Sequence, residues 1–289
     1  MYDKIKVIKC MKVVGNMKEI DLKELKKIQI EILDYVNDFC KKNKINYWID
    51  CGTLLGAIRH SGYIPWDDDI DIGMLRDDYE KFLALFNKKD GRYKLLASEN
   101  CEDYYYAFGK VIDTSTILYE PDEETGIKSG VYIDVFIYDN APDDEKLCQK
   151  MFDKRDYYDK FRVAQMYPNL YDHDNLRKRI MRFFLNIYLK LLPKNFYTKK
   201  CIKNSKKYMN KETKRVGNFT SNARAVGDKS IFASFTPVTF ENKKYPAPVG
   251  YDLWLKAFYG DYMKLPPKEK RVSLHKFKAY YIGDKDEKK

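Results

Sequence analysis

The residues best suited to chemistry are four aspartates within five consecutive positions: Asp67, Asp68, Asp69 and Asp71. Acid and apolar residues alternate over Asp69–Met74, which predicts a strand, and side chains two positions apart on a strand point the same way. Asp67, Asp69 and Asp71 are therefore expected to share one face. Such close carboxylates repel one another, and a divalent cation offsets that repulsion. Mg²⁺ prefers oxygen ligands and completes its shell with water and phosphate, so the run predicts a Mg²⁺ site, with Mn²⁺ as the alternative ion.

A further carboxylate stands in unusual surroundings. Asp134 interrupts Val131–Tyr138, whose β-branched and aromatic residues predict a buried strand. A charge in such a strand is unexpected unless it is paired or binds a metal. We therefore expect Asp134 to belong to the same metal site as the acidic run. An acidic loop and a calcium site are the alternatives that the residue types leave open.

A glycine and a threonine precede the acidic run. Gly52 permits a close approach of the backbone to a phosphate, and a helix over Thr53–Arg59 would offer its free N–H groups to the same anion. Arg59 would add a fixed positive charge. Taken alone, Gly52 is equally well explained by a simple turn.

Apolar periodicity and chain breakers predict the elements that position these groups. Helices are expected at Asp21–Lys42 with Asp21 as N-cap, at Thr53–Arg59, and at Asp78–Asn87 with Asp77 as cap. Strands are expected at Tyr47–Asp50, Asp69–Met74, Tyr93–Ala97, Ala107–Ile112, Thr116–Glu120 and Val131–Tyr138, with a loop at Pro121–Gly130.

The composition changes after Pro142. Residues 143–212 are basic with a helical pattern, and the remainder is irregular, with one helix expected at Asp252–Phe258. We expect an α+β fold with a mixed-sheet catalytic core flanked by helices at 1–142. A helical insertion would follow at 143–212, and a segment at 213–289 would pack back on the core to complete the active site.

The overall charge of the 289 residues is +11, which suits nucleic acid, a membrane surface or anionic small molecules and is also explained by solubility alone. The six cysteines are dispersed without a Cys-x-x-Cys pair, so neither structural zinc nor a disulfide framework is expected. The N-terminal residues lack the apolar stretch of a secretory signal, and no segment approaches the ~20 apolar residues that span a bilayer. These features predict a cytoplasmic protein.

One predicted helix, over Leu176–Leu192, carries Arg177, Lys178, Arg179 and Arg182 among large apolar residues. Such a helix can lie on an anionic membrane surface, which would place the protein at the inner face of the membrane. Packing on the core with solvated basic side chains explains the pattern equally well.

Two long blocks, Trp48–His60 and Gly62–Asp71, closely resemble the LicD family of phosphocholine transferases, with fukutin-related glycan phosphotransferases as distant relatives. Shorter matches follow at Asp78–Phe82, Gly109–Val111, Val131–Phe136, Tyr259–Met263 and Pro266–Pro267, so the resemblance spans nearly the whole chain. It implies a nucleotidyltransferase-like fold and a cytidine-nucleotide donor.

The resemblance also implies roles for individual residues. Asp69 and Asp71 look like the paired metal ligands of that fold and Asp134 like its third carboxylate. Gly52 and Thr53 match its phosphate-binding loop.

The implied reaction moves a phosphoalkyl group from CDP-choline, or a related CDP-alcohol, to a hydroxyl of a cell-surface glycan or lipid-linked glycan. The acceptor hydroxyl attacks the phosphorus nearest the choline-like group and CMP leaves, as in lipopolysaccharide or capsule biosynthesis. The sequence leaves open whether phosphocholine, phosphoethanolamine, an aminoalkylphosphonate or a polyol phosphate is transferred.

Several charged residues are assigned to that reaction. Arg59 and Lys110 are expected to neutralise charge that develops on phosphate. Asp134 would complete the metal site or accept the acceptor proton. Arg271 and His275, on the C-terminal segment, are further candidates for phosphate contact.

A quaternary ammonium group is held by aromatic faces. Tyr63, Trp66 and Tyr104–Tyr106 are candidates, although core packing explains most of them. Trp66 is preferred because it adjoins the acidic run.

Two other enzyme classes remain. A nucleotide-sugar-dependent glycosyltransferase also uses Asp-x-Asp and a metal, but its motif usually follows a longer nucleotide-binding region. An RNA-directed nucleotidyltransferase suits the positive charge, yet no RNA-binding signature is present, so no nucleic-acid partner is expected.

Overall fold

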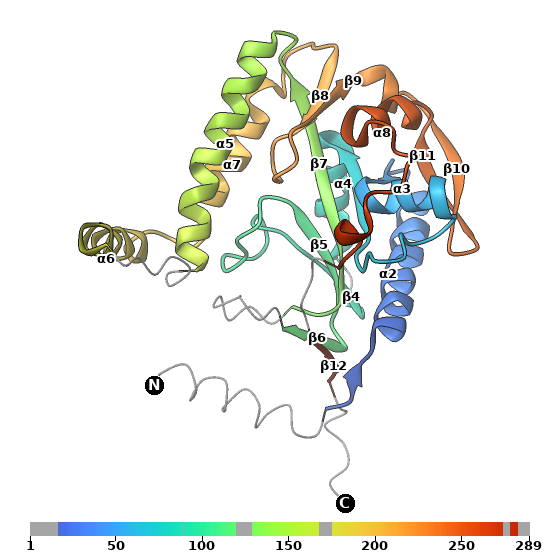
Figure 1. The fold of residues 1–289 in the computed structure, drawn as a ribbon, viewed down its shortest axis with the longest axis horizontal. Helices are drawn as coiled ribbons and strands as arrows, with labels where there is room; N and C mark the ends of the chain where they lie inside the picture. Colours follow the sequence, from blue (N-terminus) through green and yellow to red (C-terminus); the bar gives the residue numbers. More distant parts are fainter. Residues whose placement is uncertain (1–16, 89, 120–128, 168–174, 274–277, 283–289) are drawn as a thin grey trace, which may run out of the picture.

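A long strand, β7 (Tyr132–Ala141), runs through the middle of this computed structural model and organises the sheet around it (Figure 1). The structure describes residues 17–88, 90–119, 129–167, 175–273 and 278–282. The main sheet has the order β2-β3-β7-β5-β4, and β8 and β9 extend it from the end of β7. Its strands are β2 (Trp48–Ile49), β3 (Asp71–Leu75), β4 (Tyr93–Leu96), β5 (Gly109–Asp113), β8 (Arg215–Asn218) and β9 (Ala225–Asp228).

The sheet is mixed because β3 pairs with β7 in parallel, whereas the other pairs are antiparallel. The β-branched and aromatic residues of β7 suit a strand with neighbours on both sides. Val135 and Ile137 of β7 are fully buried. The expected α+β fold with a mixed sheet flanked by helices is confirmed.

The helix α2 (Leu22–Asn43) packs its apolar face on the core, as its periodicity predicted. Asp21 caps it by accepting a hydrogen bond from the Glu24 backbone N–H at 2.8 Å. Two further helices, α3 (Cys51–His60) and α4 (Arg76–Phe86), flank β3 in sequence.

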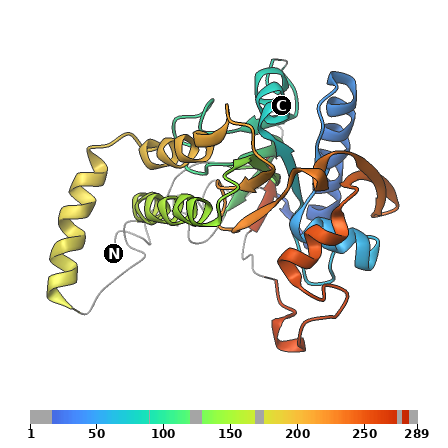
Figure 2. The ribbon, with the colours of Figure 1, turned by 90° about the horizontal axis from the view of Figure 1, so that it is seen from above.

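In the part of the segment between β7 and β8 that the structure describes, the α-helices are α5 (Glu145–Met166), α6 (Leu176–Lys190) and α7 (Phe196–Ser205). The helices α5 and α7 lie side by side, whereas α6 stands apart at the edge of the molecule in both views (Figures 1 and 2). Arg76 of α4 donates two hydrogen bonds of 2.7 Å to the buried Asp139 of β7, which also accepts one from Ser205 of α7. This buried pair ties the helices to the core.

The C-terminal part holds more regular structure than expected. Besides α8 (Tyr251–Tyr259) it contains β8, β9, β10 (Phe235–Phe240), β11 (Lys243–Pro248) and β12 (Lys278–Tyr281). Pro237 and Pro246 face each other in the β10–β11 hairpin. Proline is tolerated there because a two-stranded sheet has only edge strands, where an N–H can be absent from the ladder. The strand β12 pairs with β6 (Thr116–Tyr119) and β1 (Glu19–Ile20), so this segment packs back on the core as expected.

Several predicted boundaries were wrong, and three of them adjoin the acidic run. The helix expected to begin at Thr53 begins at Cys51. The strand expected to begin at Asp69 begins at Asp71: the chain turns at Pro65–Trp66, where the Asp67 N–H bonds to the Ile64 carbonyl at 2.9 Å, and residues 67–70 are irregular. Asp77 lies inside the first turn of α4 rather than capping it, and Leu75 holds the cap position. None of the described helices is both long and apolar enough to cross a bilayer.

Candidate active site

Three charged residues form a row across neighbouring strands of the main sheet. Asp71 on β3 lies opposite Asp134 on β7, and Asp134 lies opposite Lys110 on β5. Side chains at opposed register positions point to the same face of a sheet, so all three charges lie on one face. Nζ of Lys110 lies 3.4 Å from Oδ1 of Asp134.

Lys110 is held in a largely aromatic environment. Only 5% of its surface is exposed, and its Nζ lies 3.3 Å from the ring centroid of Tyr132 and 4.9 Å from that of Tyr106. Aromatic faces attract a cation, and a desolvated one most strongly. This packing fixes the ammonium group beside Asp134.

Asp71 stands at the centre of the negative charge. Burial raises its pKa well above the usual range of an aspartate, and the charges of Asp69 and Asp134 raise it further. Its backbone N–H donates to Oγ1 of Thr53 at 2.8 Å. Thr53 therefore fixes the start of β3 against α3, directly beside the carboxylates.

The remaining aspartates of the run lie in the irregular segment between the turn at Pro65–Trp66 and β3. Asp67, Asp68 and Asp69 each offer a carboxylate oxygen within 4.8 Å of the others. Asp68 is buried, and its Oδ2 accepts a hydrogen bond of 2.6 Å from Ser273. The expected strand does not include Asp67 and Asp69, because residues 67–70 are irregular and β3 begins at Asp71.

Gly52 lies in the first turn of α3, next to the same run. A Cβ atom at this position would lie 2.6 Å from Oδ2 of Asp67. The missing side chain therefore makes room for the Asp67 carboxylate. From the sequence we expected the backbone at Gly52 to leave room for a phosphate. In the structure the Asp67 carboxylate occupies the space beside Gly52.

A fully buried carboxylate anchors the start of α3. Asp50 accepts hydrogen bonds from the Tyr138 hydroxyl at 2.5 Å and from Nε1 of Trp254 at 3.1 Å. Burial raises the pKa of Asp50, and these two bonds oppose that rise. Because Tyr138 belongs to β7 and Trp254 to α8, this contact joins three elements on the same face of the sheet as the acidic row.

Arg59 and Arg271 lie near each other on the C-terminal side of the site. Arg59 donates to the Tyr262 carbonyl at 2.8 Å, and burial together with the charge of Arg271 lowers its pKa. Arg271 donates to the Pro266 carbonyl at 2.8 Å, and its guanidinium carbon lies 5.7 Å from the ring centroid of Trp66. The C-terminal segment thus brings a second cation and an aromatic face beside Arg59.

Comparison with known proteins decides the family. Residues 44–171 match the LicD/FKTN/FKRP nucleotidyltransferase domain. The chain is 30% identical over 273 residues to the lipopolysaccharide cholinephosphotransferase LicD of Haemophilus influenzae, and this match covers 92% of the chain and 100% of that protein. The chain belongs to the LicD family. The resemblance inferred from Trp48–Asp71 is confirmed.

More distant members of the LicD family share shorter segments. Human ribitol 5-phosphate transferase FKRP is 42% identical over 48 residues, which are 17% of this chain and 10% of FKRP. Mouse ribitol-5-phosphate transferase FKTN is 25% identical over 119 residues, which are 41% of this chain and 22% of FKTN.

The carboxylates of this LicD-family site suit a divalent cation. The oxygens of Asp67, Asp68 and Asp69 converge, and the raised pKa of Asp71 reflects crowded negative charge. A set of hard oxygen donors is the type that Mg²⁺ or Mn²⁺ takes, and such an ion would offset the repulsion. The donor set therefore fits the expected cation, although the closest group of three differs from the expected set of Asp69, Asp71 and Asp134.

Two site residues of this LicD-family chain were not anticipated. Tyr259, at the end of α8, is 44% exposed; partial burial raises its pKa, as do nearby acidic groups that include Asp71 and Asp67. Ser273 reaches Asp68 from the C-terminal segment. Tyr259 opens the matched block Tyr259–Met263, to which no role was assigned, whereas Ser273 lies outside every matched block.

Cys51 is also close to the acidic row. Its φ of 45° lies in the left-handed region, which is rare for residues other than glycine and often occurs at functional sites. Burial, followed by the charges of Asp50 and Asp71, raises the pKa of its thiol. The thiol is therefore protonated at neutral pH and is a poor nucleophile.

The other aromatic candidates are held mainly by the core. Tyr63 donates to Oε1 of Gln29 at 2.9 Å and packs on Phe240, and Tyr104 is 2% exposed. Two of the residues proposed to surround a quaternary ammonium lie beside cations of the site: the Tyr106 ring is 4.9 Å from Nζ of Lys110, and the Trp66 ring is 5.7 Å from the guanidinium carbon of Arg271. His275 lies outside the described residues.

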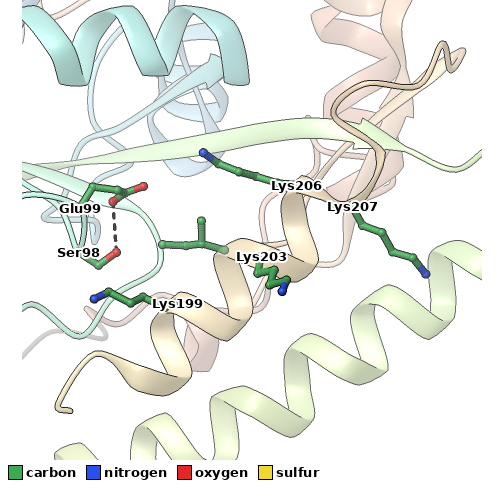
Figure 3. A pocket seen from close by; sticks show the side chains of 7 residues that line it. Ser98, Glu99, Lys199, Lys203, Lys206 and Lys207 are labelled. Carbon is green, nitrogen blue, oxygen red and sulfur yellow. Dashed lines mark hydrogen bonds between the residues drawn. The ribbon is translucent and has the colours of Figure 1, made fainter.

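A separate hollow of about 570 Å³ lies between α7 and the turn at Ser98–Glu99 (Figure 3). Its lining includes four lysines, Lys199, Lys203, Lys206 and Lys207. Ser98 donates to Glu99 at 3.2 Å on the opposite wall. None of the lining residues belongs to the acidic row, so the hollow is distinct from the site described above.

Proposed function

We propose that this chain transfers phosphocholine, or a similar phosphoalkyl group, from a CDP-linked donor to a hydroxyl of a cell-surface glycan and releases CMP. The observation that carries the proposal is the row of Asp71, Asp134 and Lys110 beside the converging Asp67–Asp69. Similarity to a cholinephosphotransferase and to two ribitol-phosphate transferases supports transfer of a phosphate-linked alcohol to a glycan.

Asp69, Asp71 and Asp134 are proposed to hold Mg²⁺ or Mn²⁺, with Asp67 close enough to join them. When bound, the ion would neutralise the donor diphosphate and polarise its P–O bonds. Lys110, fixed beside Asp134, would stabilise negative charge that develops on the transferred phosphoryl oxygens.

The bond changes follow from this arrangement. The acceptor hydroxyl oxygen forms a bond to the donor phosphorus that carries the alcohol, and the P–O bond to CMP breaks. CMP leaves with the bonding electron pair, and the hydroxyl proton passes to a carboxylate of the site that does not bind the ion. Arg59 and Arg271 would bind the donor phosphates, with Trp66 next to Arg271 as the face for a choline-like group.

The location proposed for this reaction is the cytoplasm, at the inner face of the membrane. CDP-linked donors are products of cytoplasmic nucleotide metabolism, and lipid-linked acceptors would lie in the membrane.

A donor screen tests the proposal. The purified chain is incubated with CDP-choline, CDP-ethanolamine or CDP-ribitol, with Mg²⁺ or with EDTA, and both melting temperature and CMP release are measured. A donor at about 100 times its Kd should stabilise the fold by about 2.7 kcal/mol. Stabilisation and CMP release that need Mg²⁺ would support the proposal. Stabilisation by a UDP-sugar alone would indicate a glycosyltransferase, and by UTP or ATP alone an RNA nucleotidyltransferase.

A further inference from the structure

The helix α6 presents its apolar side to solvent. Leu176, Phe183, Phe184 and Leu191 are 68%, 60%, 63% and 80% exposed, whereas the single buried residue of the helix, Leu189, is 2% exposed. A helix that only packs on a core has the opposite arrangement. Figure 2 shows α6 separated from the sheet, at the edge of the molecule.

Six of the exposed apolar residues form one stripe, and Met181 and Tyr188 lie to one side of it. Positions 176, 180, 183, 184, 187 and 191 recur at helical spacing and so lie on one side of the helix. The opposite side is anchored, since Leu189 packs with Ala164 and Tyr197, and Arg182 donates to the Tyr167 carbonyl at 3.0 Å. The anchoring leaves the stripe directed away from the protein.

The charges of α6 have one sign. Its sequence contains five basic residues and no acidic one; they are Arg177, Lys178, Arg179, Arg182 and Lys190. Pairing this helix with its counterpart in a second copy would bring like charges together, which opposes association. An anionic surface complements both the positive charge and the apolar stripe.

We propose that α6 binds the surface of an anionic membrane, with its apolar stripe among the acyl chains near the headgroups and its basic side chains on lipid phosphates. The helix then lies in the plane of the membrane. This surface needs neither donor nor acceptor, so the inference stands apart from the proposed reaction. If that reaction also holds, α6 concentrates the enzyme where lipid-linked acceptors lie.

Co-sedimentation of the full chain with vesicles tests the proposal. Vesicles of phosphatidylcholine alone are compared with equimolar phosphatidylcholine and phosphatidylglycerol. We expect binding to the anionic vesicles that is at least about tenfold tighter than to the neutral ones and that weakens with added salt. Equal binding to both vesicles, or no binding to either, would overturn the proposal.

Two variants test the two components of the surface. Replacing Phe183 and Phe184 with serine should weaken binding by about tenfold or more, because the exposed aromatic surface is lost. The matched control replaces Leu22 and Tyr35 of α2, which are 54% and 42% exposed, with serine. This control variant should bind the vesicles as tightly as the parent chain does.

The second variant removes charge. Replacing Arg177 and Arg179 with glutamine should weaken binding to anionic vesicles by about tenfold, and the control changes Lys23 and Lys27 of α2 to glutamine. The charge variant still tests the proposal if the variant that lacks Phe183 and Phe184 does not fold. Parent-like vesicle binding by the folded variants, or a dimer in light scattering that only the Phe183→Ser, Phe184→Ser change abolishes, would contradict the membrane proposal. CMP release from a soluble donor, measured in parallel, reports on the reaction separately.

Discussion

Nζ of Lys110 lies 3.4 Å from Oδ1 of Asp134, at directly opposed positions of β5 and β7. Asp134 therefore has a carboxylate, Asp71, on one side and a cation on the other. Lys110 therefore gives the acidic row a positive charge that is part of the protein chain, unlike the charge of a bound metal ion. Replacing Lys110 and replacing an aspartate of the row should therefore have different effects on the stability of the fold.

Replacing Lys110 with methionine should lower turnover by about a hundredfold, because a preorganised cation next to the reacting phosphate is lost. The change should also destabilise the fold, since Asp134 loses a partner in a poorly solvated place. CMP release and urea unfolding measure the two effects. Lys94→Met on the neighbouring strand β4, where Lys94 pairs with Asp90, is the control and should leave turnover unchanged.

Asp71→Asn and Asp134→Asn should each reduce turnover by about a hundredfold or more. In the absence of metal, Asp71→Asn should raise the melting temperature, because it removes a buried charge that neighbouring carboxylates repel. Activity and stability would then change in opposite directions. The exposed Asp77→Asn is the control. Near-parental turnover in either variant would remove that residue from the site.

Tyr259→Phe should lower turnover by about tenfold with little change in stability, because its side chain is 44% exposed yet close to the carboxylates. Steady-state CMP release at several donor concentrations separates kcat from KM. Tyr251→Phe at the start of α8 serves as the matched change and should behave as the parent. Parental kinetics in Tyr259→Phe would show that the hydroxyl takes no part.

Gly52→Ala should fold and yet lose most activity. The new methyl group would lie 2.6 Å from Oδ2 of Asp67, which must move away, while alanine itself favours the helix by about 0.5–1 kcal/mol. Circular dichroism and CMP release measure the two properties. Gly91→Ala meets no atom within 4 Å and is the control. Full activity in Gly52→Ala would mean that the position of Asp67 is unimportant.

Arg76→Met should cost about 3–5 kcal/mol of stability in urea unfolding, because Asp139 would remain buried without its bidentate partner. Lys206→Met, which breaks the more exposed pair with Glu80, should cost at most about 1 kcal/mol. Similar losses in both variants would show that burial of the Arg76 pair is not what matters.

Much of this arrangement could be predicted from local sequence. The periodic helix at Asp21–Lys42 and the isolated charge of Asp134 were recognisable because each depends on residues close in the chain. The start of β3 was misplaced because the alternation over Asp69–Met74 fits a strand throughout, while residue types alone do not show that residues 67–70 stay irregular and that pairing begins at Asp71.

Contacts between distant segments were not predictable in the same way. The bond from Ser273 to Asp68 and the position of Tyr259 depend on how the C-terminal segment folds over the core. The short strands β10 and β11 were missed since their prolines resemble breakers. The row itself needed the register of β3, β7 and β5, which only the folded sheet defines.

The segment between β7 and β8 leaves and returns at neighbouring points, because Ala141 and Arg215 are opposed in the ladder. Its length is therefore unconstrained by the sheet, and the entropy of closing a loop rises only slowly as residues are added. Evolution can extend, shorten or exchange this segment while the register of Asp71, Asp134 and Lys110 stays the same. Changes in this segment can therefore alter which acceptor the enzyme uses, or where in the cell it acts, while the charged residues of the sheet keep their positions.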